Sequence, residues 1–194
     1  MEECISVFDM LKIGVGPSSS HTLGPWRAAE RFLAELESKN LINKVNRVKV
    51  DLYGSLSLTG KGHATDLAVM LGLSGQDPEY IPIEDIAGII KTIEDSNEIN
   101  LGNKIKIPFF FLQDIVFNKN FLPFHANGLT FTAYTSEDNI YESTFYSIGG
   151  GFVVKEERAN AKKKNQIKCA FPFPIDNAKE LLEYCLSQNK KVSE

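Results

Sequence analysis

Apolar residues recur at helical spacing in four stretches of the chain. The spacing predicts helices over residues 25–38, 64–73 and 82–95. Pro25 suits the first turn of its helix, because its missing N–H costs little there. The apolar positions of this first helix are Trp26, Ala29, Phe32, Leu33 and Leu36. A last helix is predicted after Asp176, its expected N-cap, with apolar positions at Ala178, Leu181, Leu182, Cys185 and Leu186.

Alternation of apolar and polar residues predicts strands elsewhere. It is regular over residues 45–53, 129–135 and 140–148, and a hairpin-type turn at 136–139 separates the last two. In the first of these strands, Val48, Val50 and Leu52 share one face. Shorter apolar runs predict a buried strand at 109–112 and another strand at 152–155.

The order of these elements bears on the fold class. Helices and strands do not alternate regularly, which favours an α+β fold over a doubly wound parallel sheet. We expect a mixed or antiparallel sheet packed with helices. Residues 5–13 fit either a short helix or a strand, and the charged residues 156–168 are interpreted as a solvated loop. The 194 residues suffice for one domain, or for a small domain with appendages.

Four turns rich in small residues interrupt the predicted elements, and three of them contain the chain's three histidines. His21 follows Ser18, Ser19 and Ser20; His63 follows Gly60, Lys61 and Gly62; His125 precedes Asn127 and Gly128; the fourth turn joins Ser147 to Gly149, Gly150 and Gly151. Four such turns suggest one shared pocket at loop ends. The alternative is that each serves its own turn. Three consecutive glycines between strands indicate a bulge or a close approach of the backbone.

The turn before Pro25 offers backbone N–H groups, hydroxyls and an imidazole at a helix N-terminus. This combination suits a carboxylate or a phosphate, because unpaired amides and the helix dipole favour an anion. The alternative is an ordinary serine-rich loop with an N-cap.

Three kinds of chemistry compete for the histidines. A three-histidine zinc site lacks any short helical pair such as His-x-x-x-His, and a Ser–His hydrolase lacks a Gly-x-Ser-x-Gly turn. A pocket for a small carboxylate with an imidazole proton acceptor fits better. Histidine titrates near pH 6.5, which suits a general base at neutral pH.

Composition narrows the function classes. A formal net charge of −4 with 24% charged residues argues against nucleic-acid binding. No apolar run approaches the roughly 18 residues of a membrane helix. The acidic N-terminus shows no signal-peptide core, so we expect a cytoplasmic protein. Three widely spaced cysteines without a Cys-x-x-Cys pair indicate neither a disulfide framework nor a metal site, and no metal ligands are assigned.

Long ordered motifs run through almost the whole chain, at residues 6–10, 14–25, 53–56, 59–63, 65–66, 125–127, 146–152, 171–174 and 180–182. They resemble the iron–sulfur type L-serine dehydratases (L-serine ammonia-lyases), specifically their N-terminal or β domain. The resemblance presents residues 1–194 as one such domain, with a C-terminal end that looks cut. It implies the fold of that domain, which is similar to the allosteric substrate-binding domain of some phosphoglycerate dehydrogenases.

The resemblance implies a β-elimination that converts L-serine to pyruvate and ammonia. In this family a [4Fe-4S] cluster acts as a Lewis acid on the substrate, and a base removes the α-proton. The family's cluster cysteines lie in a second, helical α domain or a separate α chain, and nothing in this sequence replaces them. We therefore expect the chain to be inactive alone, to need a cluster-bearing partner, and to form a homo-oligomer.

The resemblance also suggests roles for residues in the turns. His63 is the expected proton acceptor, with His21 and His125 as rivals. Groups expected to hold L-serine are Ser18, Ser19, Ser20, Thr22, Asn127, Ser147 and the amides of Gly149, Gly150 and Gly151. Lys61 is either an anion partner or a solvated lysine. Two other functions stay open: a regulatory domain that binds serine or another small anion, and a structural dimerisation domain.

Overall fold

The computed structural model describes residues 13–135, 140–157, 173, 175 and 177–192. The chain divides into two compact units, Ser6–Ala161 and a smaller unit made of Met1–Ile5 and Lys162–Glu194. Each unit is described by itself. The predictions for residues 5–13, 136–139, 156–168 and 171–174 fall wholly or largely outside the described residues.

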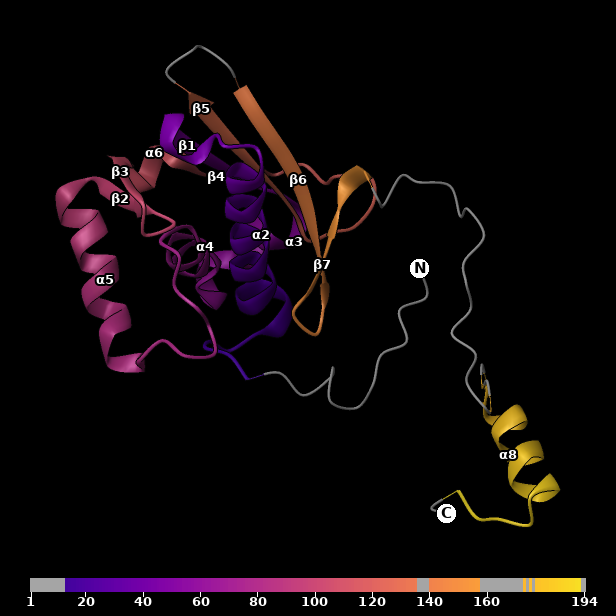
Figure 1. The fold of residues 1–194 in the computed structure, drawn as a ribbon. Coiled ribbons are helices and arrows are strands. Elements are labelled where there is room, and N and C mark those ends of the chain that lie inside the picture. The colour runs from indigo at the N-terminus through magenta and orange to yellow at the C-terminus, as the bar shows by residue number, and fades with distance from the viewer. Residues whose placement is uncertain (1–12, 136–139, 158–172, 174, 176, 193–194) are drawn as a thin grey trace. The chain divides into compact units, whose positions relative to one another are not determined.

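A mixed sheet of five strands runs through the larger unit, in the order β4-β1-β5-β6-β7 (Figure 1). The strands are β1 (Val45–Leu52), β4 (Ile115–Phe117), β5 (Gly128–Thr135), β6 (Ile140–Gly149) and β7 (Phe152–Lys155). Only the β1–β4 pair is parallel, and the other three pairs of this sheet are antiparallel. A separate antiparallel pair joins β2 (Glu98–Leu101) to β3 (Ile105–Pro108). The predicted α+β class with a mixed sheet is confirmed.

Helices cover the sheet and surround its ends. The long ones are α2 (Gly24–Ser38), α4 (Thr65–Leu73) and α5 (Ile83–Ser96), and they match the predicted helices. Short helical segments are η1 (Ser19–Leu23), η2 (Ile42–Lys44), α3 (Gly54–Thr59), η3 (Gly60–His63) and α6 (Phe111–Asp114). Helix α2 packs against α4 on one side and against β5, β6 and β7 on the other (Figure 1).

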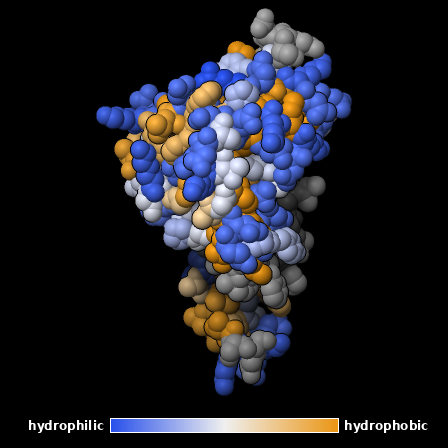
Figure 2. All heavy atoms as spheres, turned by 90° about the vertical axis from the view of Figure 1, so that its left-hand side faces the viewer, coloured by the Kyte–Doolittle hydropathy of each residue, from blue (hydrophilic) through white to orange (hydrophobic). Residues whose placement is uncertain are grey.

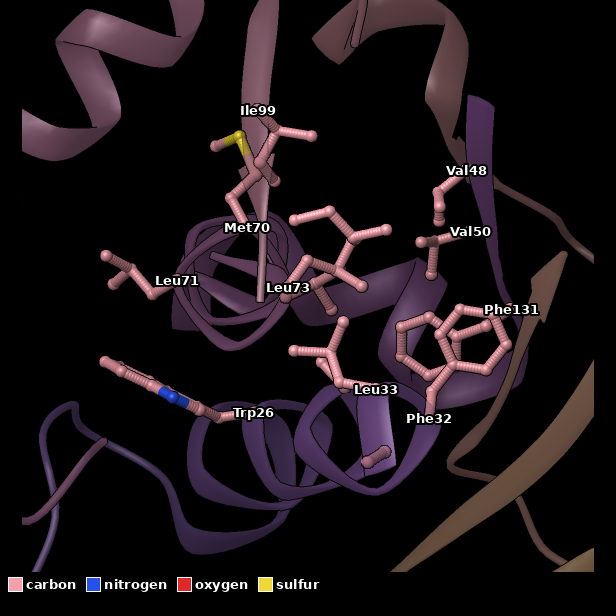
Figure 3. Packing of buried hydrophobic residues seen from close by; sticks show 14 of the residues in the cluster. Trp26, Phe32, Leu33, Val48, Val50, Met70, Leu71, Leu73, Ile99 and Phe131 are labelled. Atoms are coloured by element: carbon pink, nitrogen blue, oxygen red, sulfur yellow. The ribbon is translucent and has the colours of Figure 1, made fainter. Parts of the chain in front are cut away.

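The predicted apolar faces form the core between these layers. Trp26, Phe32 and Leu33 of α2 face residues of α4 and of the sheet, as Figure 3 shows. Phe32 stacks on Phe131 of β5 with ring centroids 5.0 Å apart and an interplanar angle of 19°. Val48, the first of the three apolar positions predicted on one face of β1, is fully buried, as are Val50 and Leu52. Helical and strand periodicity therefore predicted the packing interface as well as the elements.

Two predicted elements are wrong. The strand predicted at 109–112 is absent. Strand β3 ends before it, at Pro108, and helix α6 begins within it, at Phe111. Buried Asp114 accepts a hydrogen bond from the Phe110 N–H (2.7 Å), which closes a helical turn there. Leu112 is 87% exposed, so the run is not a buried strand.

Residues 54–59, which follow the first predicted strand and for which no helix was predicted, form helix α3. Only Gly54 needs a left-handed backbone (φ 52°), and the following residues tolerate a helix whose inner side is the fully buried Leu56.

In the smaller unit, the predicted last helix is present as α8 (Ala178–Ser187). Its N-cap is Asn177 rather than the predicted Asp176. The Asn177 side chain accepts hydrogen bonds from the N–H groups of Lys179 and Glu180. The Phe173 ring packs on that of Tyr184, with centroids 5.4 Å apart.

A half-buried polar network holds α2 against β6 and β7. The Glu35 carboxylate accepts hydrogen bonds from Tyr141 (2.7 Å), Ser143 (2.6 Å) and Lys155 (3.1 Å). Burial alone would raise the pKa of Glu35, but these three donors outweigh it and lower the pKa. Because the donors come from two strands, one helix residue fixes the position of both.

The face of the larger unit that carries α5 mixes hydrophilic and hydrophobic side chains (Figure 2). Among the large apolar side chains exposed on the larger unit, Tyr80 (81%) precedes α5, and Ile83 (74%) begins it. None of the helices in the described part of the chain is long and apolar enough to cross a membrane.

The contact between α2 and α4 leaves no space for a side chain at Gly72. A Cβ there would lie 2.7 Å from the Ala29 Cβ and 2.8 Å from the Trp26 carbonyl oxygen. We predict that Gly72→Ala lowers the free energy of unfolding by about 1–3 kcal/mol, because the two helices must separate. Urea unfolding monitored by circular dichroism measures this change.

The matched control is Gly88→Ala in α5, where an added Cβ meets nothing within 4 Å. Here the loss of backbone freedom in the unfolded chain should raise stability by about 0.5–1 kcal/mol. Equal effects of the two substitutions would contradict the packing argument.

Candidate active site

The four small-residue turns meet at one end of the sheet, where β1 and β6 end and β5 begins (Figure 1). Ser147 donates a hydrogen bond through Oγ to the carbonyl of Ser20 (2.7 Å), and Asn127 donates through Nδ2 to the carbonyl of Ser147 (3.1 Å). The Ser55 N–H donates to the carbonyl of Ala126 (2.9 Å). The structure thus brings together turns that lie up to 127 positions apart in the sequence.

Glycine is required where these turns touch. A Cβ on Gly24 would overlap the Ser147 side chain, and a Cβ on Gly54 would overlap the Ala126 carbonyl oxygen. Gly54 also has a positive φ of 52°. The close approach of α2 and α3 to the strands therefore depends on two positions without a side chain.

The serine-rich turn is helical rather than a loop. Ser18 is the N-cap of the π-helix η1, and its Oγ accepts the His21 N–H (3.2 Å). Segment η1 continues directly into α2, so the helical N-terminus lies at Ser18 and not at Pro25. The three serines differ in exposure: Ser19 is exposed, while Ser18 and Ser20 are half-buried.

His21 and His63 form a pair with ring centroids 5.0 Å apart. Two threonines cross-link their backbones. Thr22 donates through Oγ1 to the His63 carbonyl (2.8 Å), and Thr65 donates through Oγ1 to the His21 carbonyl (2.6 Å). Both threonines are buried, so the predicted substrate ligand Thr22 lies in the structure as a link between the two turns.

The hydrogen bonds of His63 fix its tautomer. Its Nδ1 lies 3.0 Å from the carbonyl oxygen of Thr59. A carbonyl oxygen only accepts hydrogen bonds, so Nδ1 carries the proton and Nε2 keeps its lone pair. No hydrogen bond from the described residues reaches that Nε2. Neutral His63 is therefore a proton acceptor at its free nitrogen.

The other two histidines differ from His63. The Asn127 N–H donates to Nδ1 of His125 (3.1 Å), so neutral His125 carries its proton on Nε2 and is a donor there. His21 has both nitrogens engaged by hydroxyls, Nδ1 by Ser20 (2.9 Å) and Nε2 by Ser55 (2.9 Å). Among the three, His63 alone has an unengaged acceptor nitrogen.

The electrostatics of the pair favour neutral His21. Burial lowers the pKa of His21, and the charge of nearby His63 lowers it further, while the hydrogen bond with Ser55 opposes both. A positive charge on His63 therefore disfavours protonation of His21.

Two residues with no role assigned from the sequence adjoin this pair. Ser55 holds His21, and Asp66 is a buried carboxyl group directly after Thr65. Burial raises the pKa of Asp66, while the Leu67 N–H lowers it, as does the charge of Lys61. Both residues lie within the matching motifs, which was the signal available for finding them.

The glycine turn forms the bulge predicted from its sequence. The β6–β7 register shifts between Ser147 and Gly149, and all three glycines of the turn have positive φ (96°, 58° and 75°). Gly150 contributes to a pocket of about 140 Å³ beside the start of η1. The other residues lining it are Gly14, Val15, Gly16, Ser18, Ser19 and Leu23. None of the three histidines lines this pocket.

Lys61 is exposed, and its Nζ lies 5.2 Å from the centroid of the Phe117 ring. Its role as an anion partner stays a prediction. The described residues contain no group of three or more His, Cys, Asp or Glu side chains that could hold a metal ion.

Comparison of the sequence with known proteins places the chain in a family. The model of the family described as "Serine dehydratase beta chain" matches residues 6–158. L-serine dehydratase 1 of Escherichia coli (strain K12) is 44% identical over 182 residues, which cover 93% of this chain and 40% of that protein. L-serine dehydratase of Haemophilus influenzae is 42% identical over 192 residues, which cover 97% of this chain and 42% of that protein. The chain thus spans about two fifths of the length of these relatives.

We predict that an NMR titration of the three histidines gives His21 a pKa below its ordinary value of 6.5. His63→Gln should raise the pKa of His21, because it removes the neighbouring positive charge. Single histidine substitutions assign the three signals.

The same shift makes stability depend on pH. Because unfolding restores the ordinary pKa of His21, the folded state should lose stability as the pH falls through the range from 6.5 to the folded pKa. His21→Gln should reduce that loss. An unchanged pKa of His21 in His63→Gln would contradict the coupling.

Proposed function

We propose that this chain, which belongs to the serine dehydratase beta chain family, is the substrate-binding and base-supplying domain of an L-serine ammonia-lyase. The reaction is the β-elimination of L-serine to pyruvate and ammonia. The observation that carries the proposal is the tautomer of His63, whose free Nε2 is a proton acceptor within a cluster of hydroxyls and amides.

His63 takes the α-proton of L-serine at Nε2. The imidazolium that forms keeps its Nδ1–H on the Thr59 carbonyl, 3.0 Å away, which holds the ring in place and stabilises its charge. His21 supports this step by staying neutral, because a second positive ring at 5.0 Å would oppose the proton transfer.

The remaining bond changes complete the elimination. As the α C–H bond breaks, its electron pair forms the Cα–Cβ double bond and the β-hydroxyl leaves as hydroxide. The 2-aminoacrylate product tautomerises to an imine, and water hydrolyses it to pyruvate and ammonia. The leaving hydroxide needs an acid or a Lewis acid, and no residue of the described site is assigned that role.

A [4Fe-4S] cluster would supply that Lewis acid, and we propose that it is carried by a domain or chain not present here. Thiolates are the usual ligands of such clusters, and the one described cysteine, Cys185, stands alone in α8. The described residues therefore do not fit the cluster, and the steps given to this chain are substrate binding and proton removal.

The polar groups of the site divide into two sets. Ser147 and Asn127 are buried and bonded to neighbouring turns, so we assign them to holding the site together. Exposed Ser19 and the turn at Gly150 line the open pocket and suit the carboxylate of a small substrate.

A second function is favoured by the lining of this pocket, which includes none of the three histidines. A domain that binds serine or another small anion beside η1 for regulation needs no proton acceptor. Such a domain would bind its ligand whether or not His63 is present. The proposed enzyme without His63 would bind L-serine but would fail to turn it over.

The first test is the completed enzyme, in which this chain replaces its matching segment in L-serine dehydratase 1 of Escherichia coli. Iron and sulfide are reconstituted without oxygen, and pyruvate formed from L-serine is followed. We expect turnover by the completed enzyme and none by this chain alone. Ligand binding without turnover, with the cluster shown intact by its spectrum, would favour the regulatory function.

In the completed enzyme, His63→Ala should lower kcat by roughly 10²-fold or more, because the proton acceptor is lost. Free imidazole should restore part of that activity. His125→Ala is the comparison. The neutral His125 ring is a donor at Nε2, so free imidazole should not restore activity to this variant as it does to His63→Ala. Near-full activity of His63→Ala would remove His63 from this role.

A further inference from the structure

Helix α3 contacts the rings of both paired histidines. Ser55, the second residue of α3, lies with its Oγ 2.9 Å from Nε2 of His21. Thr59, the last residue of α3, accepts the hydrogen bond from Nδ1 of His63 at its carbonyl oxygen (3.0 Å). Thr59 also donates through Oγ1 to the Ser55 carbonyl (2.9 Å). The two points of contact are therefore one helical turn apart, and the helix sets their separation.

The position of α3 does not depend on the histidines. The Gly54 N–H donates to the carbonyl of Asn120 (2.8 Å). The Ser55 N–H donates to the carbonyl of Ala126 (2.9 Å). Leu56 belongs to the hydrophobic core and is fully buried. Because the segment before β5 and the core hold α3, the helix can act as a fixed support for rings that come from η1 and η3.

The ring of His21 depends on this support for its direction. The hydrogen bonds of Thr22 and Thr65 join the backbones of the two histidine turns, but they leave the direction of the rings open. Of the two hydroxyls that contact the His21 ring, that of Ser20 belongs to η1 itself. Among the described hydrogen bonds of this ring, the one with Ser55 alone reaches another element.

The direction of the ring matters because the two histidines interact through their charges. Besides α3, which carries no titratable side chain, η1 packs against α2, α4, η3 and β6. His63 of η3 is the charged group that lowers the pKa of His21. Such an interaction weakens with distance and is reciprocal, so the proton affinity of His63 depends on His21 in turn. Titratable groups on the four elements also have partners of their own: Lys61 with Asp66, Arg27 with Glu30 and Glu79, Glu35 with Lys155, and Tyr146 with Glu156.

We propose that Ser55 is a positioning residue for the histidine pair, and that with Thr59 it makes α3 a two-point support that keeps the His21 ring beside His63. This inference rests on the proposed function, in which His63 takes a proton while His21 stays neutral. Loss of the Ser55 hydroxyl leaves the His63 ring on the Thr59 carbonyl but frees the His21 ring to turn. The neighbour that adjusts the proton affinity of His63 is then no longer at a fixed distance.

A double-mutant cycle in this chain, read by NMR titration of the histidines, tests the proposal without relying on activity. The measured coupling is the rise in the pKa of His21 that His63→Gln causes. In the Ser55→Ala background this rise should be at most half of that in the unchanged chain, because a ring that has turned away lies farther from position 63. Ser55→Ala alone should lower the pKa of His21, since the hydrogen bond with Ser55 raises it.

Two further variants are the controls. Ser57→Ala removes a hydroxyl from the same helix, and none of the described hydrogen bonds of the His21 and His63 rings involves Ser57. The coupling should be unchanged in this variant. Ser55→Thr keeps a hydroxyl on the same carbon and should retain most of the coupling. Circular dichroism verifies that each variant is folded.

Equal coupling in Ser55→Ala and in the unchanged chain would overturn the proposal, even in an active enzyme. Loss of coupling in Ser57→Ala or in Ser55→Thr would overturn it too, because the effect would then come from the packing of α3 and not from the Ser55 hydroxyl. Reduced coupling in Ser55→Ala, together with near-full activity of His63→Ala in the completed enzyme, would support the positioning of the pair while the proposed function fails.

Activity of the completed enzyme provides a second readout. Ser55→Ala should lower kcat by roughly 10-fold and leave KM nearly unchanged, because the histidine pair is misaligned while the pocket beside η1 keeps its lining. A higher KM with an unchanged kcat would instead indicate that Ser55 contacts the substrate, and would overturn the positioning role.

Discussion

The hydrogen bond from Ser147 Oγ to the carbonyl of Ser20 is the contact on which the site depends. It joins the end of β6 to the start of the α2 layer, one residue before His21. The approach is so close that Gly24 has no room for a side chain. Glu35 repeats the connection further along α2 by binding residues of β6 and β7. Helix α2 is therefore fixed to the sheet at two places. These contacts also fix the position of the turn that carries His21.

The backbone is strained directly after His63. Ala64, directly after His63, has φ 54° and ψ 38°, a left-handed conformation that costs a non-glycine residue about 1–2 kcal/mol. This turn lets η3 end and α4 begin while the His63 ring stays bonded to Thr59. The buried helix α4 holds the strained residue in place, because each face of α4 contacts other elements.

The sequence predicted the elements better than the contacts between them. Periodicity identified α2 and its buried face because burial repeats at 3.6 residues, and alternation identified β1 in the same way. It misassigned residues 54–59, since a glycine-led helix six residues long has too few turns to show a period. The three histidine turns could be suspected of sharing a pocket. The tautomers of the histidines could not be predicted, because the hydrogen bond from His63 to the Thr59 carbonyl exists only once η3 has formed.

The distribution of hydrogen bonds indicates which polar groups of the site are free to take part in chemistry. The hydroxyls of Ser147, Thr22 and Thr65 donate hydrogen bonds to backbone carbonyls within the site. Among the imidazole nitrogens of the described site, only Nε2 of His63 is an unengaged acceptor, and the groups near Gly150 are exposed. An elimination needs both a proton acceptor and help for the leaving group. Under the proposed function, a site with only the first of these is one side of an active site whose other side is supplied by another part of the enzyme.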